Sequence, residues 1–391
     1  MKAPATSGPW ASAAVFFTHV MLHQVVIMAA RVTTSYRVIE LGLPVEWLGA
    51  IAATFSLVPL LTAVGTGSLI DRYGERPVLL LGTASGVLGA AGLLLLPSSL
   101  IVLIACNLLL GMSHLFCVIG QHAYTAGSGD TLLRDLRFGR YTAVLSLGQV
   151  LAPLLMTAAG GDGSVPRTAD LFALAAIAAA LSALAVLLMP ASPRPPRSET
   201  IQKVAIRSVL AYRGVLPAIL VGIAVMCSID LLLIYLPVLG VEAVIPAATI
   251  TALLTVRAAT SLLSRLIYGF LIVAMGRRLL LAMSMATVAG GLAALALPVP
   301  VWVMFAAMVI AGFGIGVATP LTLSWITGIV PVHVRGLVLS LRVGGNRLGQ
   351  FGLPLVAGFV VAGWGVAPIF AILAVLLGGL SAVSYATIRD T

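Results

Sequence analysis

Long apolar runs separated by short polar stretches make up most of the chain. Each run is close to the roughly 20 residues that a helix needs to cross a bilayer. The runs are continuous and do not alternate apolar and polar positions, so they favour helices over a membrane barrel. Membrane helices are predicted at residues 11–36, 45–70, 77–97, 100–124, 139–160, 169–190, 213–238, 246–272, 278–298, 301–327, 336–362 and 365–387.

The composition supports an integral membrane protein. Of 391 residues, 60% are hydrophobic and 9% are charged, whereas about a quarter of an average soluble chain is charged. Cys106, Cys117 and Cys227 all fall inside apolar runs without metal-site spacing, so they are expected to be packing residues. We therefore expect no metal and no cofactor.

The distribution of basic residues predicts the orientation of the chain. An even number of helices puts both termini on one side, and most Lys and Arg residues fall in the loops of that side. The opposite loops offer only Arg37 and Arg167. Both termini are therefore predicted to be cytoplasmic, and the net charge of +10 to face lipid headgroups and not nucleic acid. We expect a monomeric multi-pass protein of the plasma (inner) membrane.

The chain carries an internal repeat. "GSLIDRYGERPVLL" at 67 aligns with "GFLIVAMGRRLLLA" at 269 at an offset of 202, and "LGQVLAPL" at 147 aligns with "LGQFGLPL" at 348 at an offset of 201. Transporters are often built from such parallel repeats, with the substrate site between them. The predicted division is a six-helix half at 1–190, a cytoplasmic loop at 191–212 and a second six-helix half at 213–391.

The stretch "GSLIDRYGER" resembles the signature between the second and third helices of the major facilitator superfamily. One position departs from it, because Glu75 stands where a basic residue is usual. The resemblance implies an all-helical fold of twelve membrane helices, transport by alternating access, and a loop that latches the two halves in one state. A solvated loop with topology-setting arginines is the alternative. The residues expected to form the latch are Gly67, Asp71, Arg72, Gly74 and Arg76.

Two other signatures of the family are incomplete. In "NLLLG", Asn107 replaces a usual arginine, and in "GQVLAPLLMT", Ala152 replaces the glycine before Pro153. Both departures weaken an assignment to the drug/proton antiporter branch and leave the direction of transport open.

Polar residues inside the apolar runs mark the expected substrate site, since charge in hydrocarbon is costly. The runs at 77–97, 169–190, 278–298 and 365–387 lack ionisable residues within their apolar spans, and the resemblance implies that these helices are peripheral. The repeat also pairs Gln149 with Gln350. The predicted substrate-binding residues are Gln24, Arg31, Asn107, His114, Gln149, Arg257, Arg342, Asn346 and Gln350.

Several of these residues have a simpler interpretation. Arg31 lies near a helix end and could snorkel to the membrane surface, and Arg265 could be a structural gate residue. The Asn and Gln side chains could join helix to helix. His19 and His23 could be packing or interfacial residues. Arg347 is predicted to turn away from the face of Arg342, Asn346 and Gln350.

Arg31, Arg257 and Arg342 carry three positive charges against the one negative charge of Asp230, which predicts a positive pocket that binds a small organic anion. The predicted function is secondary transport of this anion together with protons. Asp230 and His114 are the predicted proton carriers. The chain has no phosphate-binding loop of an ATP-driven pump and no catalytic constellation, so we do not expect an enzyme. A multidrug exporter of amphipathic compounds is the main alternative, and a lipid-modifying membrane enzyme or a passive channel are the others.

Overall fold

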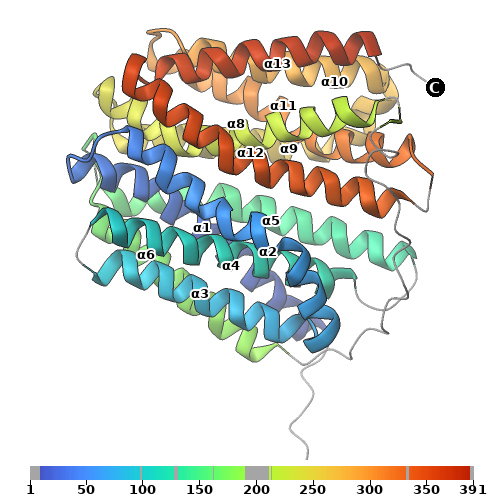
Figure 1. Ribbon diagram of the computed structural model, residues 1–391, viewed down its shortest axis with the longest axis horizontal. Helices are drawn as coiled ribbons and strands as arrows, with labels where there is room; N and C mark the ends of the chain where they lie inside the picture. The colour runs from blue at the N-terminus through green and yellow to red at the C-terminus, as the bar shows by residue number, and fades with distance from the viewer. Residues whose placement is uncertain are drawn as a thin grey trace, which may run out of the picture.

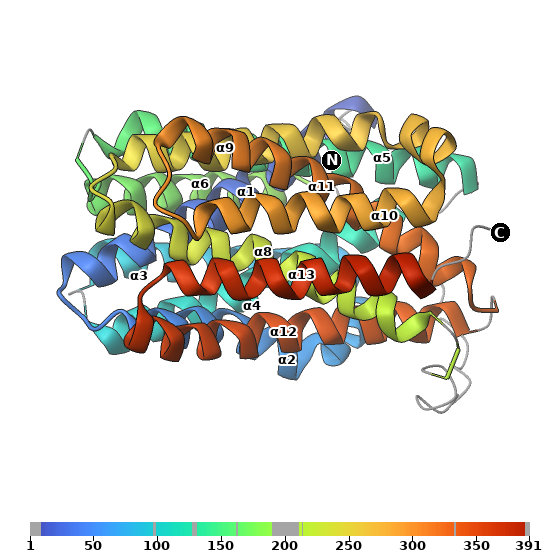
Figure 2. The ribbon, with the colours of Figure 1, turned by 90° about the horizontal axis from the view of Figure 1, so that it is seen from above.

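Every regular element of the described chain is an α-helix, and the helices lie side by side along one direction (Figure 1, Figure 2). The computed structural model describes residues 9–96, 99–126, 131–161, 163–189, 211–212, 214–331 and 334–387. The first six helices are α1 (Pro9–Glu40), α2 (Glu46–Tyr73), α3 (Glu75–Leu95), α4 (Leu100–Ala126), α5 (Thr131–Gly160) and α6 (Thr168–Leu188). The next six are α8 (Val215–Glu242), α9 (Ala247–Leu266), α10 (Tyr268–Leu295), α11 (Val301–Gly328), α12 (Arg335–Trp364) and α13 (Ala367–Thr387).

The predicted all-helical membrane fold is confirmed. Ten of the described helices are long and apolar enough to cross a bilayer by length and composition. In α2 the described apolar stretch is Glu46–Thr62, because several side chains after it lie outside the described residues, and α12 carries Arg342, Asn346 and Arg347. These two helices pack against each other.

The twelve helices form two six-helix halves, with α1–α6 in the lower part of Figure 1 and α8–α13 in the upper part. The two halves repeat the same packing. In the first half α3 packs against α4 and α6, and in the second α10 packs against α11 and α13. Likewise α4 packs against α2 as α11 packs against α9. The segment 190–210 lies outside the described residues, so the division at 190 and 213 stays a prediction.

The repeat extends to backbone conformation. Gly74 has φ 85° and ψ 170°, and Gly276, its partner at the offset of 202, has φ 72° and ψ 167°. Only glycine enters this region readily, because a Cβ would clash with the backbone. The chain breaks its helix at both positions, as predicted. The predicted helix 246–272 is interrupted by a bend at Ile267, and the chain is helical again from Tyr268 up to the break at Gly276. The apolar pattern gives no sign of this bend.

Three helix pairs join the halves, namely α1 with α8, α2 with α12 and α5 with α9. Gly49 of α2 faces α12 so closely that a Cβ there would overlap the carbonyl oxygen of Pro354. A Cβ on Gly358 would lie 2.6 Å from a backbone oxygen of α2. Across α5 and α9, the hydroxyls of Thr157 and Thr251 are 2.6 Å apart. Gly49 matches Thr251 and Thr157 matches Gly358 at the repeat offsets, so the two contacts are related by the repeat.

These contacts lie at one end of the bundle, which the predicted orientation places outside the cell and which we call the outer end. Gly49 and Thr251 are near the starts of α2 and α9, and Thr157 and Gly358 are near the ends of α5 and α12. The amide of Ala247 also donates to the carbonyl of Gly163 at 2.9 Å, which joins the start of α9 to the loop between α5 and α6. The outer end is therefore closed in this structure.

Candidate functional site

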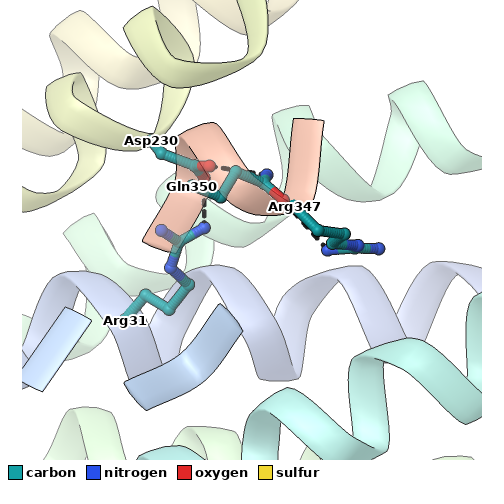
Figure 3. A network of polar contacts seen from close by, with 4 residues as sticks. All are labelled: Arg31, Asp230, Arg347 and Gln350. Atoms are coloured by element: carbon teal, nitrogen blue, oxygen red, sulfur yellow. Dashed lines mark hydrogen bonds and ion pairs between the residues drawn. The ribbon is translucent and has the colours of Figure 1, made fainter. Parts of the chain in front are cut away.

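A chain of four polar side chains crosses the boundary between the halves (Figure 3). Arg31 of α1 forms an ion pair with Asp230 of α8. Gln350 of α12 donates from Nε2 to Asp230 Oδ2 at 2.6 Å, and Arg347 donates from Nη1 to Gln350 Oε1 at 3.0 Å. We call Arg31, Asp230, Gln350 and Arg347 the central network.

The ion pair at its core is largely shielded from solvent. The side chains of Arg31 and Asp230 are 9% and 7% exposed. The guanidinium of Arg31 also lies over the ring of Phe55, with Cζ 4.7 Å from the ring centroid, a cation–π contact. Arg31 therefore does not snorkel to the membrane surface, and it binds the opposite half of the molecule.

The central region has a surplus of positive charge. Asp230 lies in the middle of α8, while every other carboxylate with a described side chain is in the first or last turn of its helix or in a loop beside it. Arg257 is 2% exposed and Arg342 is 6% exposed. The described helices therefore carry one mid-helix carboxylate and four buried or half-buried guanidinium groups away from the helix ends, those of Arg31, Arg257, Arg342 and Arg347.

Two of these guanidiniums are incompletely bonded. Arg342 donates from Nη2 to the hydroxyl of Thr322 in α11 at 3.1 Å, which keeps it within its own half. The Nε atoms of Arg257 and Arg342 are buried and have no hydrogen-bond partner among the described residues. A buried donor without a partner costs free energy, so each such group needs an explanation, and a bound anion would supply a partner for both.

The prediction for Arg347 was wrong. It was expected to turn away from Gln350, yet its long side chain extends toward the C-terminal end of the helix and donates to that amide, three residues further on. Residues three apart on a helix are neighbours, and this spacing was the available signal. Arg347 therefore joins the candidate site.

The remaining predicted substrate residues are more scattered. Asn107 donates to the Leu103 carbonyl of its own helix at 2.9 Å, but it also lines a small cleft beside Arg31. Gln24 is buried against α5, where it meets Gly148, and Gln149 is half-buried on the same helix. The Oδ1 atom of Asn346 is buried and unpaired among the described residues. None of these four is part of the central network.

His114 lies beside the network. Its ring packs against Phe55, at 5.5 Å between centroids, and Phe55 in turn carries the guanidinium of Arg31. Its other ring neighbour is His23 of α1, at 5.7 Å. His114 is thus directed toward α1 and α2.

The predicted latch is described in part. Gly74 has the positive φ that makes the turn between α2 and α3, and Arg76 donates to the carbonyl of Leu187 at 2.8 Å, which joins α3 to α6. The guanidinium of Arg72 lies over its neighbour Tyr73. Gly67 is part of α2, and the side chain of Asp71 lies outside the described residues. A latch role stays a prediction.

Arg265 connects the two halves on the other side of the site. It donates from Nη1 to the hydroxyl of Ser146 in α5 at 2.8 Å. This contact fits the expectation of a structural gate residue on α9.

The comparison with solved structures matches this architecture. The xylose transporter XylE from E. coli, in an inward-open conformation, has a TM-score of 0.77 at 15% identity, covering 98% of this chain and 97% of that chain. The nucleoside transporter NupG has a TM-score of 0.72 at 14% identity, covering 97% and 100%. A POT family transporter in complex with a thioalcohol-conjugated peptide has a TM-score of 0.75 at 13% identity, covering 95% and 94%. At these identities the likeness establishes the fold alone.

The sequence itself matches a family model. Comparison with curated proteins gave no match. The model of the Major Facilitator Superfamily, in contrast, matches residues 13–244 and 218–390, which together span nearly the whole chain. With twelve described helices in two repeated halves and a polar network where the halves meet, the chain belongs to the major facilitator superfamily and is a transporter that works by alternating access.

Proposed function

We propose that the protein transports a small organic anion together with protons. The observation that carries this proposal is the charge surplus inside the helices: four arginines are buried or half-buried there, and Asp230 is the one mid-helix carboxylate among the described side chains. Guanidinium groups pair with carboxylates and phosphates through two parallel hydrogen bonds, which gives both energy and geometric selectivity. A substrate anion would supply the charge that the protein lacks.

The geometry supports an exchange of partners. Arg31 binds Asp230 while the outer end is closed, and separating α1 from α8 during the cycle removes that partner. A buried guanidinium left alone is strongly unfavourable. A bound anion can take the place of Asp230, so that loading and opening are linked.

Proton coupling is proposed through Asp230 and His114. Protonation of Asp230 would remove the charge that holds Arg31 and would weaken its bond from Gln350. One structural neighbour is a D-xylose–proton symporter, so the fold is compatible with proton coupling.

The test is a ligand screen by thermal shift on the purified protein, with lactate, succinate, citrate, benzoate and inorganic phosphate as probes. A charge-assisted contact contributes about 1.5–3 kcal/mol, so Arg257→Ala and Arg342→Ala should each weaken anion binding by about one to two orders of magnitude. Arg257→Lys should recover only part of the loss, because it keeps the charge but not the planar fork. Arg167→Ala is the control, since this arginine is 73% exposed and bonds Asp170 in the same loop region.

Each shift is measured against the same variant without ligand, so that a change in intrinsic stability cancels. Stabilisation by cationic or neutral amphipathic compounds in place of anions would favour the multidrug alternative. Equal stabilisation of the wild type and both alanine variants by anions would remove these arginines from the site.

A further inference from the structure

The described histidines gather on two neighbouring helices of the first half. His19 and His23 are on α1, and His114 and His122 are on α4. Both ring nitrogens of His19 are bonded, Nδ1 to the Ser182 hydroxyl at 2.9 Å and Nε2 to Gln121 at 3.1 Å. His19 is therefore satisfied as a structural residue, and His122 is exposed.

His23 and His114 differ from His19 and His122. Their rings stack with centroids 5.7 Å apart and planes 10° from parallel, although they belong to different helices. His23 is 2% exposed. The Nε2 of His23 and the Nδ1 of His114 are buried without a hydrogen-bond partner among the described residues. A packing role leaves these two nitrogens unexplained, because a buried polar atom normally has a partner.

The pair lies within the electrostatic reach of the central network. Arg31 of α1 lies over the Phe55 ring that packs against His114, and Arg347 of α12 is the second guanidinium of the same network. His19 on the same helix is the other imidazole beside His23, at 6.1 Å between ring centroids. From α2, the packed side chain is the uncharged ring of Phe55. The nearby carboxylate is Asp230 of α8, which is already bonded by Arg31 and Gln350.

This arrangement links the charge of the His23–His114 pair to the binding of an anion by the arginines. A proton on either imidazole adds a positive charge beside Arg31 and Arg347, and two protons on stacked rings would repel each other as well. An anion bound by the arginines cancels the first repulsion. Anion and proton therefore favour each other's binding, and thermodynamic linkage requires the effect to be reciprocal.

We infer that the His23–His114 pair takes up one proton when the anion binds, and that the anion and this proton are carried together. The inference rests on the proposed function, and it goes further by naming where the proton is held and why it accompanies the substrate. Asp230 then joins the two halves through its ion pair with Arg31. The charge of the His23–His114 pair depends on whether the arginines have bound an anion.

Proton uptake can be measured by titrating the purified full chain with the probe anion that stabilises it most, calorimetrically, in two buffers of different ionisation enthalpy. The difference between the two heats gives the number of protons bound with the anion. The wild type should take up close to one proton per anion near pH 7, where imidazoles change charge. Its anion affinity should then rise by about tenfold per unit fall in pH.

His23→Gln and His114→Gln should each abolish most of this uptake and make anion affinity nearly independent of pH. Two single variants test the pair separately, and each is first checked for a monodisperse, cooperatively unfolding preparation. His122→Gln is the matched control on α4 and should retain the uptake.

The outcomes separate this inference from the function on which it rests. If no probe anion binds the wild type, the proposed function fails and the inference fails with it. If an anion binds without proton uptake, or if both glutamine variants take up as many protons as the wild type, the anion site stands and the histidine pair is wrong. Loss of uptake in Asp230→Asn alone would assign the proton to Asp230.

Discussion

Arg31 and Asp230 form the bond between the halves that is most sensitive to charge. Both side chains are nearly buried, and each comes from a different half of the molecule. Removing one member of a buried pair typically costs about 3–5 kcal/mol, because the other charge is left without a partner. We propose that the pair holds the outer end closed while it is intact and favours opening once Asp230 loses its charge.

Asp230→Asn should uncouple transport from the proton gradient. The amide keeps the shape of the carboxyl group but cannot carry a negative charge or exchange a proton. We expect gradient-driven accumulation of the anion to be lost, while exchange of anion across the membrane continues. Counterflow and uptake assays on the same reconstituted protein measure the two activities.

Glu242→Gln is the control, because this carboxylate ends the same helix at the outer surface. It should accumulate the anion normally. Normal accumulation by Asp230→Asn at every pH between about 5 and 8 would remove Asp230 from the coupling mechanism.

At this scale the sequence predicted residue types better than partners. Arg31, Asp230 and Gln350 were identified because polar groups inside apolar runs need a reason to be there. Their pairing was not predicted, because Arg31 and Asp230 belong to different halves, and a helical face does not reveal which residue it meets. Arg347 was missed because the prediction followed the direction of the Cα–Cβ bond, and a long flexible side chain departs from it.

The contacts that close the outer end depend on small residues. Gly49 and Gly358 let α2 and α12 touch through their backbones, and Thr157 and Thr251 join α5 to α9 at the related position. Small residues allow helices in a membrane to approach closely, which increases their van der Waals contact. The closure is thus set by backbone shape as well as by the buried ion pair.

Gly358→Ala should weaken this closure. Its Cβ would lie 2.6 Å from the carbonyl oxygen of Glu46, so α2 and α12 would have to separate. Overpacking of this kind usually costs about 1–3 kcal/mol, and we expect a lower thermal unfolding midpoint in detergent. Gly352→Ala on the same helix is the control, because a Cβ there meets nothing within 4 Å. Equal midpoints for the two variants would contradict the close crossing.

The latch predicted at 67–77 concerns the opposite end of the bundle. Asp71→Asn should slow transport while leaving anion affinity nearly unchanged, because this loop is expected to affect cycling and not substrate contact. Initial uptake rates and thermal-shift affinities on the same preparation measure both. A normal initial uptake rate in Asp71→Asn would argue against a latch. A loss of anion affinity without slower exchange would argue against it as well.

The number and kind of elements followed from the sequence for physical reasons. A bilayer fixes the length of an apolar helix, and the repeated glycine at 74 and 276 marks where each half must turn. The bend at Ile267 was not predicted, because tertiary packing can bend a helix without any helix-breaking residue in the sequence.

The whole molecule combines the fold of its family with a surplus of positive charge inside its helices. The fold could be predicted because helix count, internal repeat and the 67–77 motif are independent signals that agree. The site could be predicted only in part, because it forms where two halves meet, and their relative position is set by contacts such as Gly49 on Gly358. The surplus of positive charge near that boundary is the feature from which an anionic substrate is proposed.

Accumulation of an anion in proteoliposomes is the most direct test of the central claim. The purified protein is reconstituted, a proton gradient of about one to two pH units is imposed, and uptake of radiolabelled lactate, succinate, citrate, benzoate or phosphate is followed. A gradient of one unit supports up to about a tenfold concentration ratio for one coupled proton. We predict that at least one anion accumulates above its external concentration and leaves again when a protonophore collapses the gradient. Equilibration without accumulation, or accumulation of cationic or neutral compounds while every anion is ignored, would contradict proton-coupled anion transport.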